Sequence, residues 1–160
     1  MMPSVAIVGI GNKYRQDDRV GLAVVDRLRE QGVPPWTRLA VCDGEPSRLV
    51  ELWSFAVLAI VVDALEVRSP VPGRIHRLDV GAVAAGESPS ASRGPGLGTA
   101  VRLACEVDRM PERLVVYGVE MDEYGFGMRL SGPVRRAAGH VAEQVGADLA
   151  EFAAAARIAV

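Results

Sequence analysis

The chain has 160 residues, of which 49% are hydrophobic and 24% charged, and its formal net charge is −2. This composition is typical of a globular protein, and the length predicts one domain spanning residues 1–160. No run of Lys or Arg suggests nucleic acid or an anionic membrane as a partner, and the longest apolar run, 55–62, is far shorter than the ~20 residues of a membrane span. Without a basic export signal, and with two well-separated cysteines, Cys42 and Cys105, we expect a cytoplasmic protein with reduced thiols.

Predicted strands and helices alternate along the chain. The β-branched run 4–10 ends at glycines and predicts a strand, and apolar residues at helical spacing in 19–31 predict a helix that Gly32 ends. We expect further strands at 38–42, 57–62, 74–78 and 114–119, and further helices at 46–53, 99–107 and 134–152. The run 57–62 is apolar throughout, which suits a central strand covered on both faces. This alternation predicts a mostly parallel sheet between layers of helices.

Acidic residues stand where several predicted strands end. Asp17 and Asp18 follow the first strand, Asp43 ends the second, Asp63 ends the third, and Glu120 ends the strand at 114–119. The carboxyl ends of parallel strands lie along one edge of a sheet, where ligands of this fold class bind. Carboxylates gathered there could bind a cation or divide general acid and base roles.

Most of these acids also have a structural interpretation. Asp17 could be the N-cap of the helix that follows, and Asp18 in its first turn would complement the helix dipole. Asp43 and Gly44 make a good turn pair in any protein. Asp63 is harder to explain in this way, because an idle charge near the centre of a sheet is costly.

The glycine-rich turn after the first strand does not match a nucleotide-binding loop. The third glycine of a dinucleotide fingerprint would fall at Tyr14, and the Gly-Lys-Ser/Thr ending of a P-loop is absent. Asp17 and Asp18 at the start of the helix would also repel a pyrophosphate. The turn therefore serves something other than phosphate.

A set of short motifs along the chain resembles the hydrogenase maturation endopeptidases. In family order they are Gly9-Ile10-Gly11-Asn12, Asp17-Asp18 with Gly21, Asp43-Gly44, Val61-Val62-Asp63-Ala64, Tyr117-Gly118-Val119-Glu120 and Leu130-Ser131. The resemblance implies a three-layer α/β/α sandwich with a doubly wound, mostly parallel five-stranded sheet that contains one antiparallel strand. It also implies an activity, the removal of a C-terminal peptide from the large-subunit precursor of a nickel–iron hydrogenase after nickel insertion.

The same resemblance assigns roles to three aspartates. Asp18 and Asp63 match the family's metal-recognising acids, and Asp43 matches an acid with a supporting or catalytic role. The metal is nickel carried by the precursor, so we expect no tightly bound metal of the protein's own, and we expect a monomer.

The sequence departs from the family in the predicted loop 81–98. The motif that usually holds a metal-binding histidine aligns with Gly96-Leu97-Gly98, which places Pro95 at the histidine position and Arg93 nearby. Neither histidine of the chain is an obvious substitute, because His76 falls in a predicted edge strand and His140 on a predicted solvated helix face. Two other hypotheses therefore stay open: a catalytically impaired relative that binds the precursor as an assembly factor, and a small-molecule hydrolase on the same fold.

Overall fold

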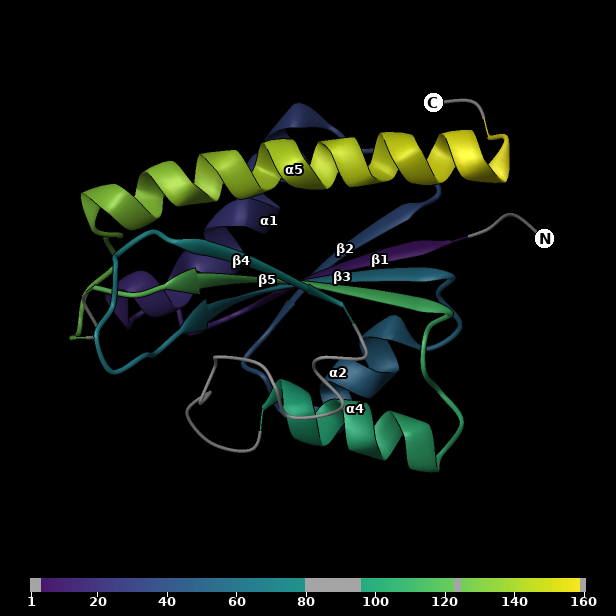
Figure 1. Ribbon diagram of the computed structural model, residues 1–160, viewed down its shortest axis with the longest axis horizontal. Helices are drawn as coiled ribbons and strands as arrows, with labels where there is room; N and C mark the ends of the chain where they lie inside the picture. The colour runs from purple at the N-terminus through teal and green to yellow at the C-terminus, as the bar shows by residue number, and fades with distance from the viewer. Residues whose placement is uncertain (1–3, 80–95, 123–124, 159–160) are drawn as a thin grey trace.

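A five-stranded mixed sheet forms the centre of the fold in the computed structural model, which describes residues 4–79, 96–122 and 125–158 (Figure 1). The strands lie in the order β2 (Thr37–Cys42), β1 (Val5–Ile10), β3 (Leu58–Leu65), β5 (Arg113–Glu120) and β4 (Ile75–Asp79). The pairs β1–β2, β1–β3 and β3–β5 are parallel, and β4 pairs with β5 in the antiparallel direction. The predicted doubly wound sheet with one antiparallel strand is confirmed.

Helices cover both faces of the sheet (Figure 1). Helices α1 (Val20–Gln31) and α5 (Gly132–Ala156) lie on one face, and α2 (Pro46–Trp53) and α4 (Leu97–Glu106) lie on the other. The side chains of β3 alternate accordingly, so that Ile60 and Val62 pack on the α1/α5 side while Ala59 and Val61 pack on the α2/α4 side. Because both faces are buried, β3 is apolar throughout its first five residues, as expected for a central strand of a three-layer sandwich.

Several predicted boundaries near the candidate site need correction. Strand β3 does not end before Asp63 but continues to Leu65, because Asp63 pairs in register with Gly118 of β5 and Leu65 pairs with Glu120. Asp17 and Asp18 lie in a separate 3-10 helix, η1 (Gln16–Arg19), so Asp18 is not in the first turn of α1. Of the predicted loop 81–98, residues 81–95 lie outside the described ranges, and the last two residues already belong to α4.

No helix in the described part of the chain combines the length and the hydropathy that a bilayer crossing requires.

Candidate functional site

The glycines of the first motif allow the chain to approach the strand ends closely. A Cβ atom on Gly9 would lie 2.2 Å from the carbonyl oxygen of Gly21, and one on Gly11 would lie 2.1 Å from that of Asp18. On Gly21 it would lie 2.5 Å from the carbonyl oxygen of Val62 in β3. Side chains at these positions would push η1 and α1 away from the sheet. The motif is therefore a packing device that places Asp18 at the carboxyl edge.

Asp17 connects two segments of the candidate site through its buried carboxylate. Its side chain is fully buried, and its carboxylate accepts hydrogen bonds from the backbone nitrogens of Asp122 at 2.9 Å and Ser131 at 2.7 Å, and from the Ser131 hydroxyl at 2.8 Å. The predicted N-cap role is wrong, because neither η1 nor α1 has a side-chain cap. Asp17 instead ties η1 to the segment between β5 and α5.

Asp18, its neighbour in η1, is oriented by the glycine turn. It is half-buried, and its Oδ2 atom accepts a hydrogen bond from the backbone nitrogen of Asn12 at 3.1 Å. Helix η1 also packs against β3, the strand that carries Asp63. The fold thus brings Asp18 and Asp63 to the same edge of the sheet.

Asp63 lies near the carboxyl end of β3 and Asp43 directly follows β2, the two strands that flank β1. Asp63 is half-buried, and its Oδ1 atom accepts a hydrogen bond from the backbone nitrogen of Ala64 at 2.8 Å. Asp43 is exposed and closes its turn by accepting a hydrogen bond from the backbone nitrogen of Glu45 at 3.1 Å. Burial raises the pKa of the nearby Cys42 thiol, and the negative charges of Asp43 and Asp63 raise it further. Asp43 and Asp63 therefore both lie close enough to Cys42 for their charges to affect its thiol. The raised pKa favours the protonated thiol, which is a poor nucleophile.

Glu120, the remaining acid of the predicted edge, has a structural role. Its side chain is only 4% exposed, and its carboxylate accepts hydrogen bonds from His76 Nε2 at 2.7 Å and from the backbone nitrogen of Val71 at 3.0 Å. Burial alone would raise the pKa of Glu120, but hydrogen bonds from His76 and Val71 and the charge of Arg74 outweigh it and lower the pKa. Glu120 and His76 therefore join β5 to the edge strand β4.

Neither histidine supplies the third ligand that the resemblance implies. His76 is hydrogen-bonded to Glu120. In the sheet register Gly118 lies between His76 and Asp63, and the side chain of Leu65 covers Gly118. His140 is exposed on α5, 3.9 Å from Glu143. Pro95 and Arg93 lie outside the described residues. Within the described ranges, no three His, Cys, Asp or Glu side chains are grouped closely enough to hold a metal ion.

Two side chains to which the sequence assigned no role support this edge. Ser131, which is part of the last family-like motif, is the partner of Asp17. Glu45 is the N-cap of α2, and its carboxylate accepts hydrogen bonds from the backbone nitrogens of Ser47 at 3.1 Å and Arg48 at 2.9 Å. Its position before Pro46, at the start of a predicted helix, was the available signal for the cap.

Comparison with known proteins shows a likeness in structure. No family model matches the sequence, and no curated protein matches it either. Among solved structures, the chain is similar to the hydrogenase maturating endopeptidase HybD from E. coli, with 24% identity, a TM-score of 0.79 and coverage of 93% of both chains. It is also similar to the [NiFe] hydrogenase maturation protease HycI from Thermococcus kodakarensis KOD1, with 21% identity, a TM-score of 0.70 and coverage of 91% of this chain and 92% of that one.

A third solved structure agrees with these two. The [NiFe] hydrogenase maturation protease HybD from Thermococcus kodakarensis has 19% identity to this chain and a TM-score of 0.68, with coverage of 89% of this chain and 97% of that one. At such identities the likeness establishes the fold. The chain has the fold of the hydrogenase maturation endopeptidases, in agreement with the motif resemblance.

Proposed function

We propose that this protein is a maturation endopeptidase that removes the C-terminal extension of a nickel–iron hydrogenase large-subunit precursor after nickel insertion. The observation that carries the proposal is the position of Asp18 and Asp63 at the same carboxyl edge, in the fold of the hydrogenase maturation endopeptidases. The motif resemblance independently pointed to these two aspartates. The substrate of this reaction is a polypeptide that brings its own nickel.

The two aspartates suit contact with a metal that arrives on another molecule. Each lies on a rigid element, Asp18 on η1 and Asp63 in β3, and each accepts a hydrogen bond from a nearby backbone nitrogen that orients its carboxylate. Carboxylate oxygens can complete the coordination of a divalent ion whose other ligands belong to the precursor. In the proposed mechanism this contact aligns the precursor tail at the edge of the sheet, and a carboxylate or the bound nickel activates the attacking water, with Asp43 in support.

The direct test is to incubate the protein with nickel-loaded precursor and to measure the mass of the large subunit. We expect a shortened subunit with nickel-loaded precursor and an unchanged one with nickel-free precursor. Asp26→Asn is the matched control for substitutions of Asp18 and Asp63 and should cleave like the wild-type protein. Asp26 is an exposed aspartate of α1 that pairs with Arg29, away from the sheet edge. Absence of cleavage by the wild-type protein, where another maturation endopeptidase cleaves its own precursor, would contradict the proposal.

A second candidate function follows from the residue at position 95. Pro95 cannot ligate a metal, so a protein that retains the fold and both aspartates could bind the precursor as an assembly factor without hydrolysis. This candidate predicts a stable complex with the precursor, no shortened product, and cleavage after the substitution Pro95→His. Cleavage by the wild-type protein would exclude it.

A further inference from the structure

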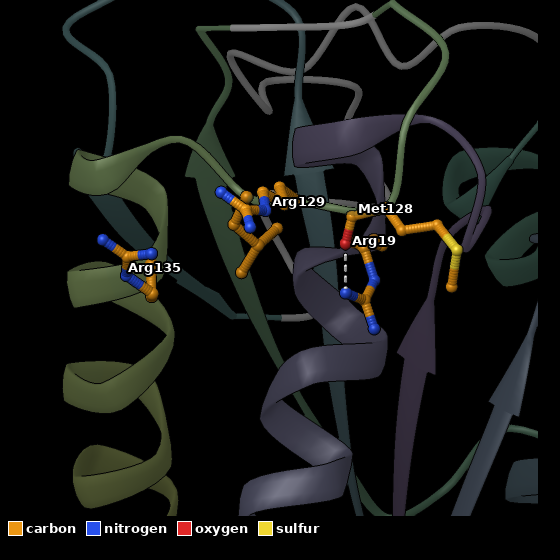
Figure 2. A pocket seen from close by; sticks show the side chains of 5 residues that line it. Arg19, Met128, Arg129 and Arg135 are labelled. Carbon is orange, nitrogen blue, oxygen red and sulfur yellow. Dashed lines mark hydrogen bonds between the residues drawn. The ribbon is translucent and has the colours of Figure 1, made fainter.

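Three arginines line an open pocket beside the candidate site (Figure 2). Arg19 is the last residue of η1, Arg129 lies in the segment before α5, and Arg135 lies in the first turn of α5. Met128 and Leu130 complete the lining, and the pocket has a volume of ≈ 460 Å³. Because Arg19 directly follows Asp18, the pocket adjoins the edge of the sheet at which we place the reaction.

The walls of the pocket are fixed by hydrogen bonds. The Nη1 atom of Arg19 donates to the carbonyl oxygen of Met128 at 2.5 Å (Figure 2). The backbone nitrogen of Gln16 donates to the carbonyl oxygen of Gly127 at 3.0 Å. The buried carboxylate of Asp17 holds Ser131 at the other end of the same segment. The arginines are therefore carried by a backbone that is already organised before a ligand arrives.

The pocket is strongly positive and lacks a counter-charge from the described part of the chain. Elsewhere, Arg48 and Arg77 form ion pairs, with Glu51 at 3.0 Å and with Asp148 at 3.0 Å. By contrast, no described carboxylate forms an ion pair with any of the three pocket arginines, and the Nε atom of Arg19 is buried without a hydrogen-bond partner in the described residues. Three arginines that line one pocket, with no ion-pair partner among the described carboxylates, indicate an anionic ligand.

The surroundings favour a peptide as the source of that anion. Phe126 is 80% exposed and Met128 is 59% exposed, and the guanidinium of Arg15 stacks 4.0 Å from the centre of the Phe126 ring. An apolar surface next to arginines complements a polypeptide with both acidic and apolar side chains, and guanidinium groups bind carboxylates through paired hydrogen bonds.

We propose that the Arg19, Arg129 and Arg135 pocket binds a carboxylate of the partner polypeptide. The inference rests on the proposed function for the identity of that partner, and it adds that the precursor carries an acidic group which docks beside its cleavage site. The pocket thereby holds the substrate tail, while the aspartates act on the metal-bearing part.

The test measures binding of short fluorescein-labelled peptides by fluorescence anisotropy, without cleavage. Two peptides with an amidated C-terminus differ only in carrying glutamates or glutamines, and a third carries glutamines with a free C-terminal carboxylate. We expect the wild-type protein to bind at least one carboxylate peptide about tenfold more tightly than the amidated glutamine peptide, as one charge-assisted hydrogen-bonded pair would produce. The third peptide shows whether a side-chain or a terminal carboxylate is preferred.

The decisive variant is Arg129→Gln with Arg135→Gln, which leaves the Arg19 hydrogen bond intact. It should lose most of the preference, whereas Arg113→Gln with Arg157→Gln should keep it, because those exposed arginines lie at the start of β5 and the end of α5. Circular dichroism checks that all variants fold. Equal binding of all peptides by the wild-type protein, or a preference unchanged in the first double variant, would overturn the inference. Because no cleavage is measured, a protein that fails to process precursor can still pass this test, and one that processes it can fail.

Discussion

The carboxyl edge of the sheet holds acidic side chains in two different environments. Asp17 and Glu120 are buried, and their oxygens accept hydrogen bonds from elements far away in the sequence. Asp18 and Asp63 are half-buried and accept hydrogen bonds from backbone nitrogens within a few residues of themselves. Asp17 and Glu120 join elements of the fold, whereas Asp18 and Asp63 keep part of their surface accessible at the edge. Neighbouring carboxylates on one edge can therefore serve stability and chemistry separately.

The largest expected effect is a loss of precursor cleavage when either half-buried aspartate, Asp18 or Asp63, is replaced. Asp18→Asn and Asp63→Asn should each lower the rate of precursor cleavage by about 100-fold or more, because each removes a carboxylate from the proposed contact with substrate nickel. Through its local backbone bond, neither substitution should lower the free energy of unfolding by more than about 1 kcal/mol, since the amide keeps an acceptor oxygen for that bond. Single-turnover cleavage and urea denaturation measure the two effects. A variant that cleaves at the wild-type rate would remove its aspartate from the site.

Asp17 should give the opposite result. In Asp17→Asn one carboxylate oxygen becomes an amide nitrogen facing donors of Ser131 or Asp122, so a buried N–H loses its acceptor. We expect the free energy of unfolding to fall by about 3 kcal/mol, by urea denaturation, because the lost bonds are to a charged group and leave a buried donor unpaired.

The matched variant for Asp17 is Ser131→Ala. It removes one hydroxyl bond and keeps the bond from the Ser131 backbone nitrogen, so it should lower the free energy of unfolding by only about 1 kcal/mol. If both substitutions cost the same, the backbone bonds to Asp17 contribute little, and the comparison between the two environments fails.

Glu120 provides a smaller effect that depends on pH. Because its pKa in the folded protein is lowered from the ordinary value of 4.5, its contribution to stability is complete above that value. The contribution is lost as pH falls through the lowered pKa, so Glu120→Gln should flatten the acid side of the stability curve. At neutral pH the substitution should cost about 2 kcal/mol through the weakened bond to His76. Thermal unfolding measured from neutral pH down to about pH 3 tests the slope, and an unchanged acid side would contradict the assignment.

The architecture could be predicted because each layer leaves a local pattern. The helical spacing around Val24 and Leu28 and the continuous apolar run of β3 follow directly from burial on one face or on both. The end of β3 could not be placed correctly, because a carboxylate after an apolar run is a common sign of a strand end. Pairing with β5 extends the strand beyond Asp63, and that pairing depends on the tertiary structure.

The different roles of the adjacent residues Asp17 and Asp18 could not be predicted from the local sequence. Asp17 and Asp18 share the same turn, and the partner that distinguishes them, Ser131, is 114 residues from Asp17. The arginine pocket was hidden in the same way, because Arg19, Arg129 and Arg135 form no run in the sequence. The motifs predicted which residues gather at the edge, and tertiary contacts decide what each one does there.

The smallest expected effect tests whether the charge of Asp63 raises the pKa of the Cys42 thiol. Burial and the charges of Asp43 and Asp63 raise the pKa of the Cys42 thiol, so Asp63→Asn should lower that pKa slightly. At a fixed pH below the pKa, the thiolate fraction and hence the rate of alkylation by iodoacetamide should rise about twofold, as expected for a partly screened charge. Exposed Cys105 lies on α4 and provides an internal control in the same sample, followed by peptide mass. Equal acceleration at both cysteines would indicate loosening of the whole fold, whereas acceleration confined to Cys42 would show that the carboxylate of Asp63 acts on the Cys42 thiol.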